Sequence, residues 1–478
     1  MFHVEDEVGL EKGPPPALAR WAIPTFVVLF LMSLLDYMDR NILYAVLPQV
    51  KTALRLNNTQ AGLLATYFLI TYSLIGLVMG WAGDRARRTW LFGLGVGLWS
   101  LATVGSGLAR SYGQLVLARS LLGIGEATYG VIAPTILLDL FRRQQRARVL
   151  SAFYLAMPIG SALGLALGGY VATRWDWRWA FFIAGVPGLI GALAALVLPE
   201  PVRGSSEGVD TERLRAHEQA GATRADFLDL MGNSSYTYAV GGMAAYTFVI
   251  GGMLVWFPTF LVRTRGIELA RANSLLGVVT LCAAIVGMSV GGWLADRLAK
   301  ANAGALFIVP ALALLGAVPF VLMGLFSRSE AGIFACVFLA EALMFMNTGP
   351  CNAVIANVVA PNMRAAAFAI AVLGVHFLGD IWSPVLIGKV ADLCGDPLTM
   401  SSGIGRVLVA LGVTPTQVPG QPPENIAAGL LIVVPALALA GVILLAGARH
   451  LPRDMAQMLA KLKVGEKGIV PPGLQTGV

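Results

Sequence analysis

The sequence predicts an all-α membrane protein in which twelve transmembrane helices form two six-helix bundles. Of its 478 residues, 57% are hydrophobic and only 13% are charged, whereas an ordinary soluble domain carries roughly 25% charged residues. The apolar residues fall into windows of about 20, the length that a helix needs to cross the hydrocarbon core of a bilayer. One long polar stretch, residues 200–234, separates six such windows from six more.

The twelve windows follow one another along the chain, separated mostly by short polar loops. The first, Trp21 to Pro48, is long enough to span a bilayer. The approximate centres of the twelve are residues 34, 70, 100, 125, 160, 188, 248, 284, 314, 343, 377 and 436. Glycines at 160, 164 and 168 form a small-xxx-small pattern, which predicts that the fifth span approaches another helix closely.

Lysine and arginine gather on one side of the predicted membrane. With a cytoplasmic N-terminus, that side carries Lys12, Arg20, arginine clusters at 85–88 and 142–148, and the basic C-terminal tail. This positive-inside bias predicts that both termini are cytoplasmic. We expect a cell membrane, the inner one in a bacterium. Anionic lipid headgroups then account for the net charge of +7, so the expected partners are membrane lipids and not nucleic acid.

A repeated motif supports duplication of a six-span unit. GWAGDR at residues 80–85 returns as GWLADR at 292–297, each at the end of the second span of its half, and Arg148 and Arg364 form a weaker echo. Duplicated bundles that rock about a central site are typical of secondary transporters. The predicted units are a cytoplasmic tail (1–20), an N-terminal bundle (21–199), a cytoplasmic linker holding either an amphipathic helix or no regular structure (200–234), a C-terminal bundle (235–448) and a cytoplasmic tail (449–478).

Both copies of the motif resemble the loop between the second and third spans of the major facilitator superfamily, although Arg87 stands where that family usually has glycine. In that family the acidic residue engages a neighbouring helix terminus and arginines to latch one conformation, as the helix dipole and charge-assisted hydrogen bonds allow. The alternative is a solvated turn that anchors lipid headgroups. The resemblance implies a latch of Gly80, Asp84, Arg85, Arg88, Gly292, Asp296, Arg297, Arg148 and Arg364.

Further segments are similar to the Spinster branch of that superfamily, which includes lipid transporters. They are DYMDRN, GLLATYFLITYS, RSLLGIGEATYGVIAPT, SAFYLAMPIGSALG and HFLGDIWSPVLIGKVAD. The similarity covers nearly all of residues 20–200 and is thinner in the second half. Asp36 stands where Spinster relatives usually have asparagine, so the first span carries one extra carboxylate.

Ionisable residues in the first and fourth spans are the main functional candidates, because one charge in hydrocarbon costs roughly 2.5–3.5 kcal/mol on insertion scales. Asp36 and Arg40 are four residues apart and could neutralise each other. Arg119 and Glu126 are about two helical turns apart and share one face. We hypothesise that Asp39, Arg119 and Glu126 form a proton-coupling switch in which an arriving proton releases Arg119. The alternative is a permanent ion pair that locks spans one and four together.

Polar and aromatic residues of other spans are expected to line the substrate cavity with Asp36 and Arg40. His376 and Asp380 lie four apart, and an inert pair is an equally good interpretation for that histidine. The remaining cavity candidates are Tyr37, Trp256, Glu341 and Asn347.

The intramembrane charges favour a cationic or amine-bearing cargo, since five acidic residues stand against Arg40 and Arg119. We therefore expect a proton-coupled secondary transporter that moves a lipid-like or amphiphilic substrate, of the sphingoid or lysophospholipid class, by alternating access as a monomer. An exporter of hydrophobic cationic drugs or other small organic solutes, and a transport-inactive receptor or scaffold, are the alternatives. The chain has no HExxH, GxSG or P-loop motif and no ligand-like cysteine spacing, so we expect no enzyme activity, cofactor or metal.

Overall fold

The fold consists of membrane-length helices. The computed structural model describes residues 16–141, 143–201, 230–359, 364–417 and 422–458. In this part of the chain, twelve helical segments are long and apolar enough to cross a membrane, which confirms the predicted fold class and number of spans. Most of the predicted linker and most of both predicted tails lie outside the described residues.

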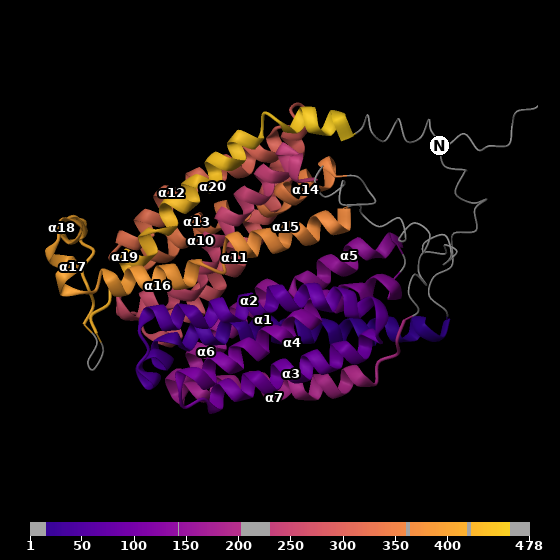
Figure 1. The fold of residues 1–478 in the computed structure, drawn as a ribbon, viewed down its shortest axis with the longest axis horizontal. Helices are drawn as coiled ribbons and strands as arrows, with labels where there is room; N and C mark the ends of the chain where they lie inside the picture. Colours follow the sequence, from indigo (N-terminus) through magenta and orange to yellow (C-terminus); the bar gives the residue numbers. More distant parts are fainter. Residues whose placement is uncertain (1–15, 142, 202–229, 360–363, 418–421, 459–478) are drawn as a thin grey trace, which may run out of the picture.

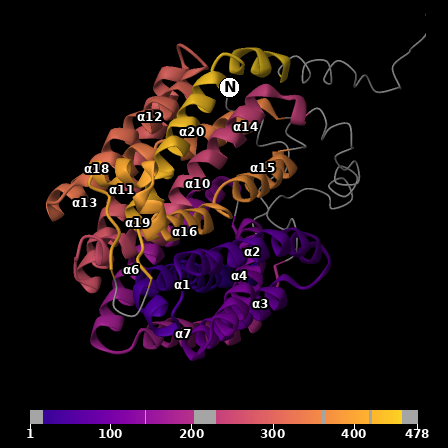
Figure 2. The same cartoon turned by 60° about the vertical axis from the view of Figure 1, so that its left-hand side comes forward.

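The helices form two bundles that lie side by side and follow the order of the sequence (Figures 1 and 2). The N-terminal bundle contains α1 (Pro16–Leu54), α2 (Asn58–Arg85), α3 (Arg88–Leu108), α4 (Tyr112–Leu140), α5 (Arg143–Tyr154), α6 (Ala156–Arg174) and α7 (Trp177–Leu196). The C-terminal bundle contains α10 (Ser234–Arg263), α11 (Leu269–Ala299), α12 (Ala305–Phe326), α13 (Glu330–Phe345), α14 (Thr348–Val358), α15 (Arg364–Leu378), α16 (Ser383–Leu393), α19 (Ile426–Leu431) and α20 (Val433–Gly447).

Four of the spans are each built from two consecutive helices. The breaks lie between α5 and α6, α13 and α14, α15 and α16, and α19 and α20. The break before α16 contains Gly379, where an added Cβ would lie 2.5 Å from the Ala244 carbonyl oxygen of α10. It is followed by Pro384 in the first turn of α16. Irregular backbone at membrane depth is tolerated where neighbouring helices bury it, as α10 does here.

Glycines let α1 and α6 pack backbone against backbone, as the small-residue pattern predicts. A Cβ at Gly160 would lie 2.5 Å from the Leu34 carbonyl oxygen, and one at Gly164 would lie 2.4 Å from the Met38 carbonyl oxygen. Between membrane helices such close packing takes the place of the hydrophobic effect. It fixes the α1 segment that carries Asp36, Asp39 and Arg40.

The two bundles touch at one end of the spans. We call the end where α1 begins the near face and the end where α1 finishes, at Leu54, the far face. Interbundle hydrogen bonds join Thr66 of α2 to the Ile381 carbonyl oxygen (2.7 Å) and Asn273 of α11 to the Ala45 carbonyl oxygen (3.0 Å). Both lie toward the far face, which is on the left in Figure 1. In this conformation the far face is therefore closed.

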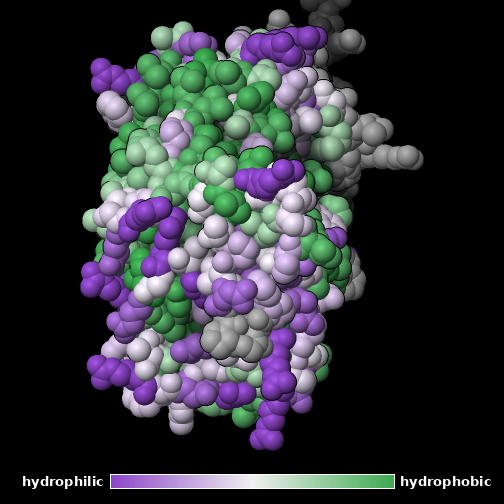
Figure 3. Space-filling view, turned by 90° about the vertical axis from the view of Figure 1, so that its left-hand side faces the viewer, coloured by the Kyte–Doolittle hydropathy of each residue, from purple (hydrophilic) through white to green (hydrophobic). Residues whose placement is uncertain are grey.

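The loop after α16 contains structure that the sequence analysis did not anticipate. Two short helices, α17 (Pro397–Ser401) and α18 (Gly403–Ala410), project beyond the far face (Figure 1). Thr416 and Glu424 then form an isolated antiparallel bridge that leads the chain back to α19. Figure 3 looks onto this face, where hydrophobic residues gather in the upper part, over the C-terminal bundle. The segment matters because it carries Glu424 to the junction of the bundles.

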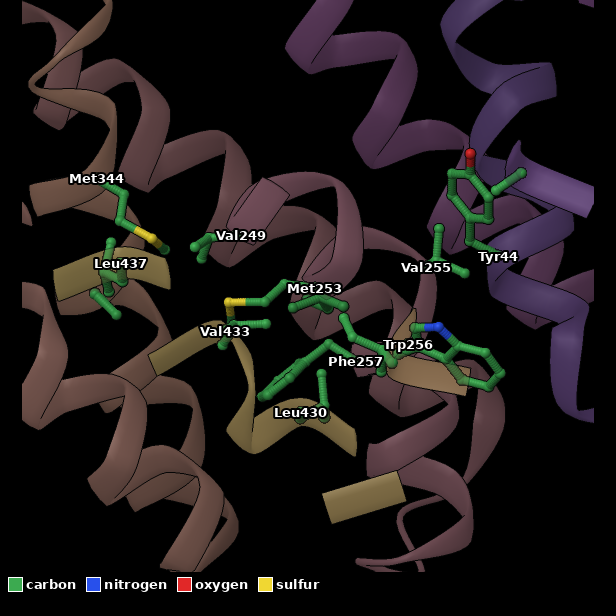
Figure 4. Close-up of a cluster of buried hydrophobic side chains, with 14 of the residues drawn as sticks. Tyr44, Val249, Met253, Val255, Trp256, Phe257, Met344, Leu430, Val433 and Leu437 are labelled. Carbon is green, nitrogen blue, oxygen red and sulfur yellow. The ribbon is translucent and has the colours of Figure 1, made fainter. Parts of the chain in front are cut away.

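One hydrophobic cluster runs across the junction of the two bundles. Figure 4 shows Tyr44 of α1 beside Val255 and Trp256 of α10, with Met253 and Val433 deeper in the C-terminal bundle. All five are buried. The junction is thus part of the packed interior in this conformation, and opening the far face requires this cluster to separate.

Candidate functional site: a charged centre in the N-terminal bundle

The centre of the N-terminal bundle is an ion pair between α1 and α4. Arg40 donates to Oε2 of Glu126 from Nη2 at 2.6 Å and from Nε at 3.2 Å. The carboxylate is completely buried, and the arginine side chain keeps 17% of its exposure. A charge-assisted pair of this geometry offsets part of the desolvation cost of both groups.

Asp36 and Asp39 lie beside this pair, and both are buried. Asp36 is 3.9 Å from Nη2 of Arg40, beyond hydrogen-bond distance, so the neutralisation expected for these two residues is only partial. The main partner of Arg40 is Glu126 of α4, whose Oε2 lies 2.6 Å from the same Nη2 atom. Asp39 accepts a hydrogen bond from Thr103 of α3 at 2.7 Å.

Arg119 is not paired in the expected way. It is only 1% exposed, and its Nε and Nη2 atoms have no hydrogen-bond partner among the described residues. The expected ion pairs to Glu126 or Asp39 within 4.0 Å do not form in this conformation, since Glu126 turns to Arg40. The Arg119 guanidinium instead lies 5.3 Å from the centre of the Phe68 ring. A buried cation without a carboxylate partner is costly, so Arg119 can donate to a carboxylate that moves toward it.

Aromatic rings surround Arg40 and extend the centre toward the C-terminal bundle. The guanidinium lies 5.1 Å from the ring centre of Tyr37, 4.9 Å from that of Phe68 and 5.3 Å from that of Tyr72. Tyr72 of α2 in turn meets His376 of α15 edge to face, with ring centres 6.4 Å apart. The structure thus brings Tyr37 and His376 to one place, with aromatic faces that suit a cation or an apolar chain.

His376, in the last turn of α15, and Asp380, in the break before α16, form the expected pair. Nδ1 of the imidazole lies 2.9 Å from Oδ1 of Asp380. The histidine remains partly exposed, whereas the aspartate is buried. This pair faces the charged centre across the bundle junction, on the side of Tyr72.

Two cavity candidates are buried in the packed interior of this conformation, and their place in a substrate cavity stays a prediction. Trp256 is 0% exposed, and its Nε1 donates to the Pro384 carbonyl oxygen at 2.8 Å (Figure 4). Asn347 is also 0% exposed and donates to the Met344 carbonyl oxygen at 3.1 Å, at the break between α13 and α14. Packing at the junction and backbone satisfaction at a helix break account for these side chains.

Glu341 lies apart from the charged centre, inside the C-terminal bundle. Its carboxyl group is buried near Thr280 of α11 and Tyr246 of α10. Its Oε2 atom is buried without a hydrogen-bond partner among the described residues. Glu341 is therefore a buried acidic group of the C-terminal bundle that lies apart from the charged centre of the N-terminal bundle.

A charged cluster that the sequence analysis missed holds the far face closed. Lys51 of α1 binds Glu424 and Asn58, and Glu424 also accepts from Nη1 of Arg263 at 3.1 Å. Nη2 of Arg263 donates to the Pro48 carbonyl oxygen at 2.7 Å. Lys51 and Glu424 are far apart in the sequence and lie in ordinary polar contexts, so no sequence pattern marks them.

Asp392 adds a second contact at the far face. Its Oδ1 accepts from the backbone N–H (3.0 Å) and side chain (2.7 Å) of Asn58, and its Oδ2 accepts from the backbone N–H (2.8 Å) and hydroxyl (2.6 Å) of Thr59. These N–H groups begin α2, where the helix dipole favours an anion. A carboxylate of the C-terminal bundle thus caps a helix of the N-terminal bundle. We call the contacts of Lys51, Arg263, Asp392 and Glu424 the far-face latch.

The predicted near-face latch stays a prediction. The side chains of Asp84 and Arg364 lie outside the described part of the structure, and the space beside Gly80 and Gly292 is open. The side chains of Arg85, Arg148, Asp296 and Arg297 are exposed.

Arg88, the last residue of the predicted latch motif, lies in an ion-pair network within the N-terminal bundle. Its Nη1 lies 2.6 Å from Asp139 of α4, and its Nε lies 3.1 Å from Glu200 after α7. Glu200 also accepts from the backbone N–H and the hydroxyl of Thr89, each at 2.9 Å. Partial burial alone would raise the pKa of Glu200, but the hydrogen bonds from Thr89 and Arg88 outweigh it and hold that pKa below its ordinary value.

Comparisons with known proteins agree with this architecture. The model of the Major Facilitator Superfamily matches residues 29–384. Protein spinster homolog 1 of Homo sapiens is 34% identical over 409 residues, which cover 81% of this chain and 76% of the human protein. Protein spinster of Drosophila melanogaster is 32% identical over 378 residues, covering 77% of this chain but only 62% of the fly protein, so the chain spans less than two thirds of that relative.

Solved structures share the fold. A bacterial homologue of the human lysosomal transporter Spinster, in an inward-facing and unoccupied conformation, matches with a TM-score of 0.77 and 22% identity, over 91% of this chain and 98% of the other. A D-xylose-proton symporter matches with a TM-score of 0.68 and 17% identity, over 89% of this chain and 97% of the other. Together with the matching family model and the curated relatives, the fold places this chain in the major facilitator superfamily, among the transporters of the Spinster family.

Proposed function

We propose that this transporter is proton-coupled and moves a lipid-like or amphiphilic substrate by alternating access. The observation that carries the proposal is the buried charged centre, in which Arg40 holds Glu126 at 2.6 Å while Arg119 lacks a carboxylate partner within 4.0 Å among the described residues. Buried charges of a membrane protein are retained at such a cost chiefly where they serve ion or substrate movement. Asp39, one residue from Arg40, supplies a further buried carboxylate.

The orientation follows from the positive-inside bias of the sequence. With both termini in the cytoplasm, the near face is cytoplasmic and the far face is external. The closed far-face latch then makes the described conformation an inward-facing one. We further propose that the near-face motif residues, including Asp84 and Asp296, take over the latching role when the far face opens.

The switch that we propose uses Asp39, Arg119 and Glu126, with Arg40 as an added member. Arg119 and Glu126 lie on one face of α4, and Asp39 approaches the same region from α1. Ionised Asp39 attracts Arg119, and a proton on Asp39 removes that attraction. Arg119 is then free to compete with Arg40 for Glu126. Exchange of Glu126 between the two arginines would loosen the contact between α1 and α4 and couple protonation to bundle movement.

The substrate class follows from charge and from the aromatic surroundings. Asp36, Asp39 and Glu126 outnumber Arg40 and Arg119, so a cationic group or a proton improves the charge balance of the centre. The rings of Tyr37, Phe68 and Tyr72 offer faces for an ammonium group or an apolar chain. An amine-bearing sphingoid lipid or a lysophospholipid combines these features.

Transport into proteoliposomes with an imposed pH gradient tests this function. The probes are a labelled lysophospholipid, a labelled sphingoid base and a hydrophobic cationic dye, each measured with and without the gradient. We expect gradient-dependent accumulation of at least one lipid probe and its loss when the gradient is collapsed. Movement of the dye alone would favour a drug exporter, and movement of no probe under any condition would favour a receptor or scaffold.

A further inference from the structure

The environment of Asp36 is not explained by an ion pair with Arg40. Arg40 directs both Nε and Nη2 to Glu126 and leaves Asp36 at 3.9 Å. Oδ2 of Asp36 and Oε2 of Glu126 lie 3.9 Å and 2.6 Å from the same Nη2 atom of Arg40, so the two carboxyl groups are neighbours. Oδ1 of Asp36 and Oε1 of Glu126 are both buried and have no donor among the described residues. Two neighbouring carboxyl groups therefore each have a buried oxygen without a hydrogen-bond donor.

Two ionised carboxylates cannot hydrogen-bond each other, because neither carries a donor. Their like charges also repel strongly where water is excluded. With Arg40 as the adjacent cation, two ionised carboxylates leave a net charge of −1 at membrane depth. One proton placed between them supplies the missing donor and makes the group of three neutral. The same chemistry makes paired aspartates share a proton in other proteins.

We propose that Asp36 and Glu126 form a carboxyl dyad that holds one proton between its oxygens, as a proton-binding site separate from Asp39. Any role of the dyad in transport rests on the proposed proton-coupled function, whereas its proton occupancy does not. No bond other than the O–H bond is made or broken when the proton leaves for water.

The groups that face the dyad come from three helices. From α1 they include Arg40, whose charge opposes protonation, and from α4 they include Arg119, which acts in the same direction. None of the neighbouring tyrosines is charged at neutral pH. Among the described residues, the charged and titratable neighbours are Tyr37, Asp39, Arg40 and Tyr44 of α1, Tyr72 of α2, and Arg119 and Tyr129 of α4.

Asp39 is distinct from the dyad in its contacts. Its Oδ2 accepts from the Thr103 hydroxyl at 2.7 Å, so it faces α3, whereas Asp36 faces Glu126 on α4. The N-terminal bundle can therefore hold two protons at separate places, one on Asp39 and one in the dyad. A carrier with two such sites has the capacity to move up to two protons in each cycle.

Proton counting on the purified full-length protein tests the proposal without a substrate. Potentiometric titration between about pH 5 and pH 9, a range that includes strongly shifted carboxyl groups, should show one proton fewer in Asp36→Asn than in the wild type. Glu126→Gln should lose the same proton. The double variant Asp36→Asn/Glu126→Gln should lose no more than either single variant, because both remove one shared site. Asp36→Asn combined with Asp39→Asn should lose two.

Infrared spectroscopy supplies an independent readout and a control. The protonated-carboxyl band of the wild type at neutral pH should weaken in Asp36→Asn and be unchanged in Asp396→Asn, which alters an exposed carboxylate at the far face. The dyad is refuted if the band and the proton count of Asp36→Asn equal those of the wild type, or if the losses in Asp36→Asn and Glu126→Gln add. Transport that ignores a pH gradient, together with an intact dyad proton, would refute only the coupled function.

Discussion

The Arg40 guanidinium of α1 binds the Glu126 carboxylate of α4, with Nη2 2.6 Å from Oε2, although Arg119 lies on the same helix as Glu126. The pair ties the helix that carries Asp36 and Asp39 to the helix that carries Arg119. It also leaves Arg119 as a buried cation that has no carboxylate within 4.0 Å among the described residues. The stability and the movement of the N-terminal bundle are both expected to depend on this one contact.

Removing the cation should cost more stability than removing both partners. Arg40→Met leaves Asp36 and Glu126 buried without their cation, and breaking such a pair typically costs about 3–5 kcal/mol. Arg40→Met/Glu126→Gln should recover a large part of that loss, since it removes the stranded charge. Thermal unfolding of the detergent-purified variants measures both effects. Equal destabilisation of the single and double variants would show that the loss of stability does not come from the unpaired Glu126 charge.

A glycine at the bundle junction should control whether the far face can close. A Cβ at Gly62 of α2 would lie 2.3 Å from the Pro384 carbonyl oxygen, whereas one at Gly76 of the same helix would have no described atom within 4 Å. Gly62→Ala should therefore shift the equilibrium away from the closed far face by about tenfold, equivalent to about 1.4 kcal/mol. Gly76→Ala, the matched control, should leave it unchanged.

Spin labels at Arg55 and Leu398, which are exposed on opposite bundles at the far face, report this equilibrium as a distance distribution. The labels are attached to cysteines that are introduced at these two positions, in a variant without the four native cysteines. A wild-type distribution in Gly62→Ala would mean that the α2 and α16 backbones do not limit closure.

The far-face latch should stabilise the same closed state through charge. Asp392→Asn keeps the shape of the side chain but removes the anion at the start of α2 and replaces one of the two oxygens that accept from Asn58 and Thr59 with an NH2 donor. Loss of a charge-assisted cap of this kind costs about 1–2 kcal/mol. With the same pair of labels, the open population should rise in Asp392→Asn and stay at the wild-type level in Asp396→Asn. No difference between these two variants would remove Asp392 from the latch.

The network at the start of α3 should make stability depend on pH through Glu200. Hydrogen bonds from Thr89 and Arg88 hold the pKa of Glu200 below its ordinary value. The stabilisation is therefore present above the unfolded-chain pKa of about 4.3 and is lost as the pH falls through the lower folded-state value. The difference in unfolding temperature between the wild type and Glu200→Gln should shrink as the pH is lowered below about 4.3. Glu268→Gln, at an exposed carboxylate, should show no such trend.

The sequence was sufficient for the spans and for the identity of the charged residues, because hydropathy and the cost of intramembrane charge are local properties. It could not assign their partners. The distance from Arg40 to Glu126 depends on how α1 and α4 pack, and so does the absence of a described carboxylate within 4.0 Å of Arg119. Trp256 illustrates the converse, since an aromatic residue in a span is equally compatible with a cavity wall and with the buried junction where it lies.

The far-face latch shows a second limit of the sequence. Lys51 and Glu424 meet only because the segment after α16 folds back through the Thr416 and Glu424 bridge. Contacts between residues so distant along the chain are set by tertiary structure, and the pattern of one sequence does not show which residues pair. Asp392 is the last residue of the segment HFLGDIWSPVLIGKVAD, which resembles the Spinster family. Its role as a cap for α2 becomes visible only in the three-dimensional structure.

The most direct test of the proposed coupling is proton flux measured together with substrate movement in the same proteoliposomes. A pH-sensitive dye inside the vesicles reports protons while a labelled lysophospholipid or sphingoid base, whichever the protein moves, reports transport. We predict that substrate movement drives a proton flux in the wild type. In Asp39→Asn we predict that this flux is lost while exchange of labelled for unlabelled substrate persists. Substrate movement at the wild-type rate with no proton flux, or an unchanged flux in Asp39→Asn, would contradict the account.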